Sequence, residues 1–150
     1  MVQEPRCQPE NMKGIYALEI SVNKSIFVKV GKLSVLNFDK GRYIYLGSAQ
    51  NNLEKRVERH MRKHKKRFWH IDYLLANGHV KIANAFLRSG AKSEECRFAV
   101  ELARGSLPII GFGSSDCRCV SHLYKIDDYQ LLRRRMAEGG WGSFGRSEVR

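Results

Sequence analysis

The sequence predicts a single α/β domain of the α+β kind, with a small, mainly antiparallel sheet flanked by helices. Short stretches at 14–22, 25–30 and 43–46 are rich in β-favouring residues and are bounded by turn-forming residues, which is typical of antiparallel strands. A charged amphipathic segment at 51–67 follows the third strand and is expected to form a helix. Its apolar stripe consists of Leu53, Val57, Met61 and Phe68. A chain of 150 residues is long enough for one core but short for two.

The remaining elements are expected in a simple order along the chain. Residues 1–12 lack periodicity and are expected to form a flexible arm, residues 13–138 the domain, and residues 139–150 a mobile tail rich in Gly and Arg. Asn51 or Asn52 is expected to cap the basic helix, because an Asn side chain accepts a hydrogen bond from the first free amides. Ser93 is expected to cap a later helix in the same way. The other expected elements are a turn at 39–41, a continuation of the basic helix or a second short helix at 69–76, strands at 80–87 and 121–126, helices at 94–104 and 127–138, and a loop at 105–113.

Composition and charge indicate the class of partner. The net charge is +12, from 27 Lys and Arg against 15 Asp and Glu, an excess that is typical of proteins that bind nucleic acid or an anionic membrane surface, and that also serves solubility alone. No apolar run approaches the roughly 20 residues needed to cross a bilayer, so no membrane contact is expected. The N-terminal residues lack the apolar core of a secretory signal, and the four cysteines are therefore expected to be reduced in the cytoplasm.

The basic segment at 51–67 is the strongest indication of nucleic-acid binding. Gly47-Ser48 is expected to form a turn with exposed amides at the N-terminus of the helix, which attracts anions. Helical spacing places Arg56, His60, Lys63 and Arg67 along one border of the apolar stripe. Arg59 and Lys66 add to the same cationic segment, in which Glu58 is the only acidic residue after Lys55. We therefore expect this segment to contact phosphates.

Two tripeptides and two spaced residues resemble the signature of the GIY-YIG nuclease superfamily. Gly14-Ile15-Tyr16 supplies the first half, and Tyr45-Leu46-Gly47 the second, with Leu46 in place of the family's Ile. Arg56 and His60 follow at the family spacing. The resemblance covers roughly 14–102, and the region at 112–122 is similar to the small stand-alone (Uri-like) branch. The stretch between the two tripeptides is longer than usual in the family, so an extra hairpin is expected there.

The resemblance implies a role for each of these side chains. Both hydroxyls, of Tyr16 and Tyr45, are expected to reach the scissile phosphate, with Tyr16 as a candidate general base. A phenol has a pKa of about 10, so this role requires nearby cations. Arg56 suits the stabilisation of a phosphate, because its planar fork matches two oxygens. His60 is expected to carry protons, bind phosphate or orient a tyrosine, with packing at the edge of the core as the alternative.

Glu95 is the candidate metal ligand. Helical spacing places it near the middle of the buried face formed by Phe98, Ala99 and Leu102, where an unpaired carboxylate is costly. The alternative is a first-turn glutamate that turns back to solvent and favours the helix dipole. GIY-YIG nucleases hold one divalent ion with a helical Glu at this place, so the resemblance implies one Mg²⁺ or Mn²⁺ at Glu95.

A polar loop at 112–122 holds several more ligand-type residues. They are Ser114, Ser115, Asp116, Cys117, Cys119 and His122. We expect a packed loop near the active site, in which Ser114, Ser115 or Asp116 replaces an Asn that many family members have. The alternative is a structural zinc site formed by Cys117, Cys119 and His122 with Asp116 or Cys96, although Cys-x-Cys differs from the common zinc knuckle.

The function expected from these features is metal-dependent hydrolysis of DNA phosphodiester bonds. The first alternative is a nucleic-acid-binding module of the same fold without catalysis, and the second is a zinc-stabilised interaction domain. Duplex, branched or damaged DNA are all expected substrates. Because the sequence shows no second DNA-binding domain, specificity is expected to need a homodimer or a partner protein.

Overall fold

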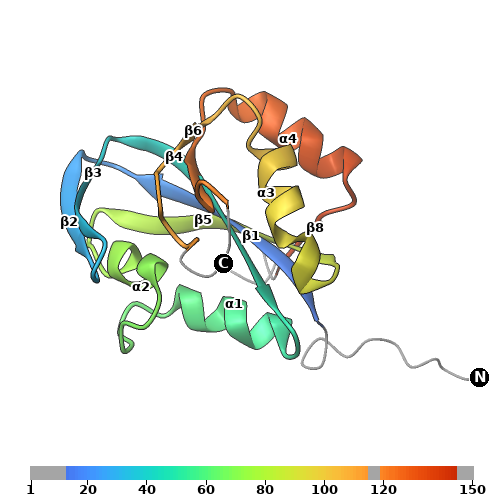
Figure 1. Ribbon diagram of the computed structural model, residues 1–150, viewed down its shortest axis with the longest axis horizontal. Coiled ribbons are helices and arrows are strands. Elements are labelled where there is room, and N and C mark those ends of the chain that lie inside the picture. The colour runs from blue at the N-terminus through green and yellow to red at the C-terminus, as the bar shows by residue number, and fades with distance from the viewer. Residues whose placement is uncertain (1–12, 115–118, 145–150) are drawn as a thin grey trace, which may run out of the picture.

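The computed structural model describes residues 13–114 and 119–144 (Figure 1). The expected N-terminal arm, the last part of the expected tail, and Ser115, Asp116 and Cys117 lie outside the described residues. No helix among the described residues is both long and apolar enough to cross a bilayer.

The main sheet is antiparallel throughout and has six strands in the order β6-β7-β4-β1-β5-β8. Its strands are β1 (Gly14–Val22), β4 (Gly41–Ala49), β5 (Val80–Ser89), β6 (Leu107–Pro108), β7 (Leu123–Lys125) and β8 (Gly142–Ser143). A separate hairpin pairs β2 (Ile26–Val30) with β3 (Ser34–Phe38). This hairpin is the extra arm expected between the two tripeptides. The expected α+β class with a mainly antiparallel sheet is confirmed.

Helices cover both faces of the sheet (Figure 1). They are α1 (Leu53–Met61), α2 (His70–Leu75), the short 3₁₀ helix η2 (Lys92–Glu94), α3 (Glu95–Leu102) and α4 (Tyr129–Glu138). The first two pack on one face together with the hairpin, while α3 and α4 pack on the other. Side chains of β1 alternate between these two cores, with Tyr16 and Leu18 in the first and Ile15 and Ala17 in the second. The central strand is therefore buried on both faces.

The register of β1 and β4 brings the two motif tyrosines together. Leu18 pairs with Tyr45, and Tyr16 pairs with Gly47, so the tyrosines are diagonal neighbours on one face. Their ring centroids are 6.4 Å apart. The predicted proximity of Tyr16 and Tyr45 is confirmed.

The basic helix ends six residues earlier than predicted, at Met61 rather than Arg67. Continuing the helix would stack a run of like charges with no apolar face to bury. The chain instead turns at Arg62, and Phe68 is 74% exposed, so its assignment to the apolar stripe is wrong. Lys63 also lies outside the helix, and its ammonium donates to the carbonyls of Leu75, Asn77 and Val80.

Several expected boundaries and caps are also wrong. Gly47 and Ser48 belong to β4 rather than to a turn. Asn52 precedes α1 in a left-handed conformation (φ 52°), which Asn tolerates, and makes no side-chain cap. Ser93 lies inside η2 rather than capping α3. At the C-terminal end, β8 pairs with β5, so the ordered domain extends into the residues expected to form a mobile tail.

Gly14 allows the first tripeptide to sit against β5. A Cβ at this position would lie 2.4 Å from the carbonyl oxygen of Arg88 and 3.1 Å from Cα of Ser89. Both are backbone atoms of β5, which cannot give way as a flexible side chain does. The glycine is therefore required by the close approach of two strands.

We predict that Gly14→Ala lowers the free energy of unfolding by about 1–3 kcal/mol, the usual cost of overpacking. Urea denaturation measures the change. Gly78→Ala is the matched control, because a Cβ there meets nothing within 4 Å and is expected to leave stability nearly unchanged. Equal stabilities of the two variants would contradict the prediction.

Candidate active site

A cleft of about 250 Å³ opens between the two layers of helices. Its lining comes from β1, β4, α1, the start of α2, the η2–α3 junction and the loop before β7. The lining residues are Tyr16, Tyr45, Gly47, Ser48, Arg56, Phe68, Trp69, His70, Lys92, Glu95 and Gly113. Four of the five predicted catalytic residues are among them, and the fifth, His60, lies directly behind Tyr16. A second, mostly apolar cavity of about 300 Å³ lies on the far side of His60, between α1 and β5, away from the other predicted residues.

Tyr16 and His60 form a buried polar pair. The Tyr16 hydroxyl lies 2.7 Å from Nε2 of His60. Burial lowers the pKa of His60 to about 3, more than the nearby Asp72 carboxylate raises it, so the imidazole is neutral at neutral pH. Burial also raises the pKa of Tyr16 above its usual range, and Arg56 offsets this only in part. Arg56 alone therefore does not bring the pKa of Tyr16 down to its usual value, because desolvation outweighs its charge.

The environment of His60 fixes which of its nitrogens carries the proton. The Asp72 carboxylate on the Nδ1 side favours the tautomer with its proton on Nδ1, in which Nε2 accepts a hydrogen bond from the Tyr16 hydroxyl. Nδ1 has no hydrogen-bond partner among the described residues, but Oδ1 of Asp72 lies 4.0 Å from it. Tyr16, His60 and Asp72 thus form a row in which an imidazolium would face a carboxylate.

Asp72, which was not predicted as a site residue, lies behind the Tyr16–His60 pair. It is fully buried and accepts hydrogen bonds from Arg59 at 3.0 and 3.1 Å, Phe68 N at 2.8 Å and Trp69 N at 2.9 Å. Burial alone would raise the pKa of Asp72, but the bonds from Arg59 and these amides outweigh it and lower the pKa below its usual value. Asp72 is therefore ionised, and Arg59 is engaged inside the protein.

Arg56 extends over the cleft from α1. Its Nη1 donates to the carbonyl oxygen of Ser48 at 3.1 Å, and its guanidinium carbon lies 4.7 Å from the centre of the Trp69 ring. Arg59 contacts the same ring at 4.6 Å. The Trp69 ring thus stacks against two arginines. Because this contact uses the face of the Arg56 guanidinium, N–H groups at its edge other than the one bound to Ser48 can donate to an anion in the cleft.

Gly47 keeps the floor of the cleft open beside Tyr16. A Cβ at this position would lie 2.4 Å from the Tyr16 hydroxyl oxygen. The second tripeptide therefore needs glycine to accommodate the tyrosine of the first.

Glu95 enters the cleft from the first turn of α3. Its Oε1 accepts a hydrogen bond from Ser48 Oγ at 2.6 Å, and its Oε2 lies 2.6 Å from Nδ1 of His122. Burial would raise the pKa of Glu95, but His122, Ser48 and Lys92 lower it, so the side chain is a carboxylate. Its side chain is only 13% exposed, so it does not turn back to solvent. The partners of the carboxylate come from β4 and the segment before β7, and it reaches the cleft between them.

The ligand-rich loop is only partly described. Ser114 is buried, and the neighbouring Gly113 lines the cleft and donates its N–H to Nδ1 of His70 at 2.8 Å. Nε2 of His122 lies 3.5 Å from Sγ of Cys96, and the sulfur atoms of Cys96 and Cys119 are in contact as a disulfide pair. Ser115, Asp116 and Cys117 lie outside the described residues.

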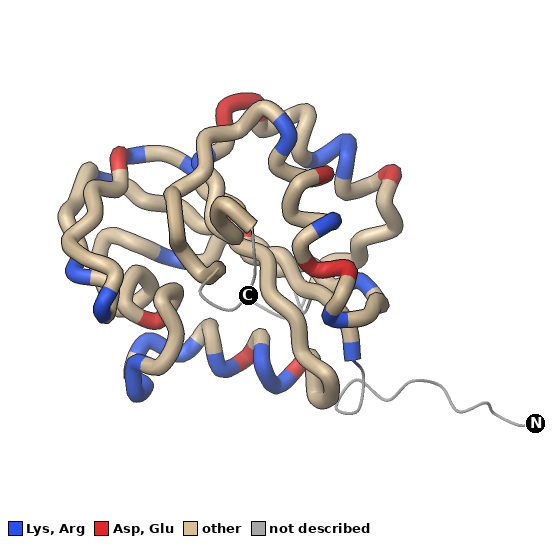
Figure 2. Tube along the Cα trace, viewed as in Figure 1, with Lys and Arg blue, Asp and Glu red and all other residues tan. Residues whose placement is uncertain are grey.

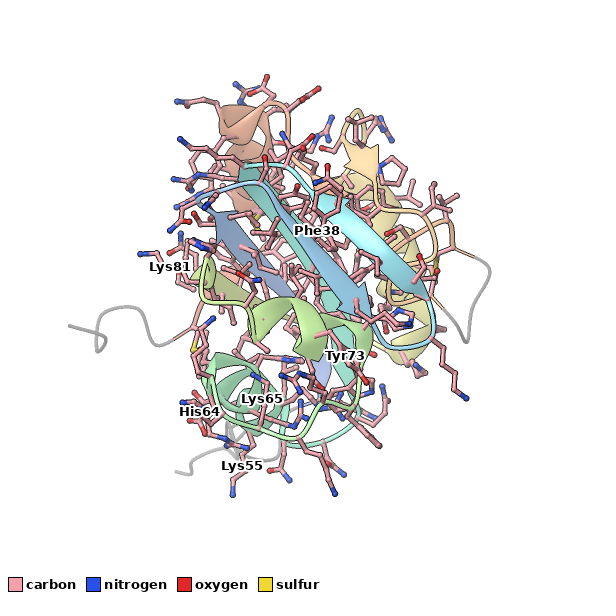
Figure 3. The ribbon with its side chains drawn as sticks, turned by 90° about the vertical axis from the view of Figure 1, so that its left-hand side faces the viewer. Phe38, Lys55, His64, Lys65, Tyr73 and Lys81 are labelled. Atoms are coloured by element: carbon pink, nitrogen blue, oxygen red, sulfur yellow. A yellow bond between two sulfur atoms is a disulfide. The ribbon has the colours of Figure 1, made fainter. Side chains whose placement is uncertain are left out.

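The predicted nucleic-acid contacts divide into two groups. Arg59 and Lys63 bind carboxylate and carbonyl groups within the protein, whereas Lys66 and Arg67 are exposed on the loop after α1. Lys55 and Arg62 are also exposed, and Figure 2 shows the cations concentrated along α1 and this loop. Lys55 and His64 project from the edge of the molecule near α1 (Figure 3).

Trp69, His70 and Lys92 also line the cleft but were not predicted as site residues. The signals available for them were weak. Trp69 and His70 directly follow the basic run, and Lys92 precedes Glu95 by less than one helical turn.

The fold and the cleft define a small α+β domain whose buried tyrosines, arginine and carboxylate meet at one concave surface. Residues 15–140 match the family described as "Domain of unknown function DUF123", and the chain belongs to this family. The matched range includes the whole cleft, from Tyr16 to Gly113. No curated protein and no solved structure matches the chain.

The lowered pKa of His60 predicts that the protein loses stability in mild acid. The unfolded chain binds a proton at His60 near pH 6.5, whereas the folded protein does so only near pH 3, so folding is progressively penalised as the pH falls through this window. The expected loss between pH 7 and pH 5 is about 2 kcal/mol. Urea denaturation at both pH values measures it. Between the two pH values, His60→Gln should lose less free energy of unfolding than the parent, by this same amount. The exposed His64→Gln should behave like the parent. An equal loss in all three proteins would refute the assignment of this pH dependence to His60.

Proposed function

We propose that this protein is a divalent-metal-dependent endonuclease that hydrolyses DNA phosphodiester bonds by a GIY-YIG-type mechanism. The observation that supports this function best is the meeting of Tyr16, Tyr45, Arg56 and Glu95 in one cleft. These residues come from four different elements, and each is of the type that the nuclease signature requires. A structural core alone does not need a carboxylate and an arginine at the same concave surface.

Glu95 fits a hard divalent cation. It is ionised, both of its oxygens are positioned by Ser48 and His122, and it faces a cleft with room for a phosphate. Mg²⁺ or Mn²⁺ commonly binds through one or two carboxylates together with substrate phosphate and water. When bound, such an ion supplies charge stabilisation for the phosphate and its leaving oxygen.

Tyr16 and His60 provide a route for the proton of the attacking water. The Tyr16 oxygen accepts the water proton while its own proton passes to Nε2 of His60, 2.7 Å away. The resulting imidazolium faces the Asp72 carboxylate, which favours its charge. Tyr16 thereby acts as a base without a permanently ionised phenol.

Tyr45 and Arg56 act on the phosphate itself. Burial raises the pKa of Tyr45 well above its usual value, so its hydroxyl stays neutral and donates a hydrogen bond. Arg56 contributes a permanent positive charge and a fork that matches two phosphate oxygens. Together they stabilise the negative charge that accumulates in the transition state.

The alternative is a nucleic-acid-binding module of the same fold that does not cleave. The favouring observation is that both oxygens of Glu95 are engaged by Ser48 and His122. Substitution of Glu95 separates the two functions, because a binder has no need of its charge.

DNA of duplex, branched or damaged structure is the proposed partner, and the proposed location is the cytoplasm. A second copy of the chain or a partner protein would supply specificity. The cationic loop and α1 supply a surface for the phosphate backbone, and the cleft opens beside it.

We predict that Glu95→Gln loses nicking of supercoiled plasmid by about a thousandfold, because the metal loses its charged ligand. DNA binding should remain at the parent level. Thermal stability should fall slightly, since the bonds from Ser48 and His122 lose their charge assistance. The controls are Glu94→Gln and Glu101→Gln, which are expected to nick like the parent. Full activity in Glu95→Gln, or a loss confined to Glu101→Gln, would place the metal on a different carboxylate.

Arg56→Lys tests the geometry of the phosphate contact rather than its charge. Lysine keeps the positive charge but lacks the fork, so we expect nicking to fall by about 10²–10³-fold while DNA affinity is kept. Single-turnover cleavage and fluorescence anisotropy measure the two quantities. Cleavage at the parent rate would exclude Arg56 from the transition state.

Exposed cations near the cleft should determine the salt dependence of DNA binding. Changing Lys55, Arg62 and Lys66 together to Ala should lower the slope of log K against log salt by about 2–3, if each neutralises one phosphate. In the matched control, Lys24, Lys32 and Lys40 are changed to Ala. These lysines are also exposed, they lie on or beside the β2–β3 hairpin, and their substitution removes the same total charge. Equal slopes for the two triple variants would move the DNA surface away from α1.

A further inference from the structure

Three metal-ligand side chains meet next to Glu95, outside the lining of the cleft. They are Cys96, the second residue of α3, and Cys119 and His122, which precede β7. One ligand atom of each lies within 4.8 Å of the others. Thiolate sulfur and imidazole nitrogen are the ligands that zinc prefers, and these distances suit neighbouring positions around one ion.

His122 is oriented as a metal-bound histidine is. Its Nδ1 lies 2.6 Å from a carboxylate oxygen of Glu95, a contact that favours the tautomer with the proton on Nδ1. The lone pair is then on Nε2, and this atom faces Sγ of Cys96 at 3.5 Å. Histidines that bind zinc commonly donate their other ring N–H to a carboxylate in this way, which fixes the ring and strengthens the ligand.

The backbone around His122 holds this orientation. Its N–H donates to Phe112 O at 2.8 Å, and its carbonyl accepts from Leu46 N at 3.0 Å. The side chain is 3% exposed. The imidazole is therefore fixed between β4 and α3 by the fold rather than by the two sulfurs.

The Cα atoms of Cys96 and Cys119 are 6.3 Å apart, a separation that suits either a disulfide or two ligands of one metal. In a disulfide, neither sulfur carries a proton or a positive charge for the Nε2 lone pair of His122 to bind. Two thiolates, by contrast, neutralise the charge of one Zn²⁺, so the partly buried group carries no net charge.

We propose that Cys96, Cys119 and His122 bind one Zn²⁺, and that Glu95 supports the site through His122. Binding converts two thiols to thiolates and releases their two protons, with no change in oxidation state. A water molecule or a further ligand takes the fourth position. The zinc fastens the start of α3 to the segment before β7, and this orients the carboxylate that faces the cleft. The proposal does not rest on the nuclease assignment, because bound metal is measured directly.

The experiment measures zinc in the full chain purified under reducing conditions. We expect about one zinc per chain by elemental mass spectrometry, and visible absorption of tetrahedral thiolate-bound Co²⁺ after metal exchange. The double variant Cys96→Ser, Cys119→Ser should lose both signals. Cys7→Ser, which removes a thiol outside the described residues, should keep them. A parent protein without zinc or cobalt binding, with Cys96 and Cys119 linked as a disulfide under the same conditions, would overturn the proposal.

A second variant keeps all three ligands and guards against misfolding of the double variant. Glu95→Gln removes only the carboxylate behind His122, so its zinc affinity, measured by competition with a coloured chelator, should fall by about 10–100-fold. An unchanged affinity would overturn the role of Glu95 in the zinc site. Loss of nicking in Glu95→Gln with zinc still bound supports the proposed nuclease, whereas full nicking with weakened zinc binding contradicts the nuclease and leaves the zinc site standing.

Discussion

The buried carboxylate of Asp72 determines the arrangement of the basic side of the domain. A charge in a fully buried position must be compensated, and here Arg59 and two backbone amides do so. Satisfying it requires the chain to fold back after α1 and places Trp69 beneath Arg56. The same carboxylate lies near His60, so one structural requirement positions both Arg56, which lines the cleft, and His60, which contacts Tyr16.

The cleft also depends on a sheet that is covered on both faces. Tyr16 and Tyr45 belong to one core, whereas Glu95 begins a helix that packs on the other. Side chains from opposite faces can meet only at the end of the strands. Ser48, near the end of β4, makes this connection because its hydroxyl binds Glu95 and its carbonyl accepts from Arg56.

Much of this arrangement could be predicted from the sequence, and the exceptions have a common cause. The tyrosine pair follows from alternation along two strands, and Arg56 and His60 follow from helical spacing. The inward bonds of Arg59 and Lys63 could not be predicted, because their partners come from α2 and β5 rather than from the same helix. The end of α1 depends on those same distant contacts. Asp72 could not be predicted as part of the site, because nothing near it in the sequence indicates that His60 lies beside it.

The pairing of β1 with β5 has a consequence for how the domain folds. Gly14 pairs with Ser89, so the central strand is completed only when residues far apart in the chain have met. Closing such a long loop costs entropy before any contact compensates for it, and folds dominated by non-local pairing form slowly. During synthesis, Tyr16 and Tyr45 are therefore both present in the chain before the cleft can form. Assembly of the concave surface coincides with completion of the sheet, so the site appears with the native state rather than ahead of it.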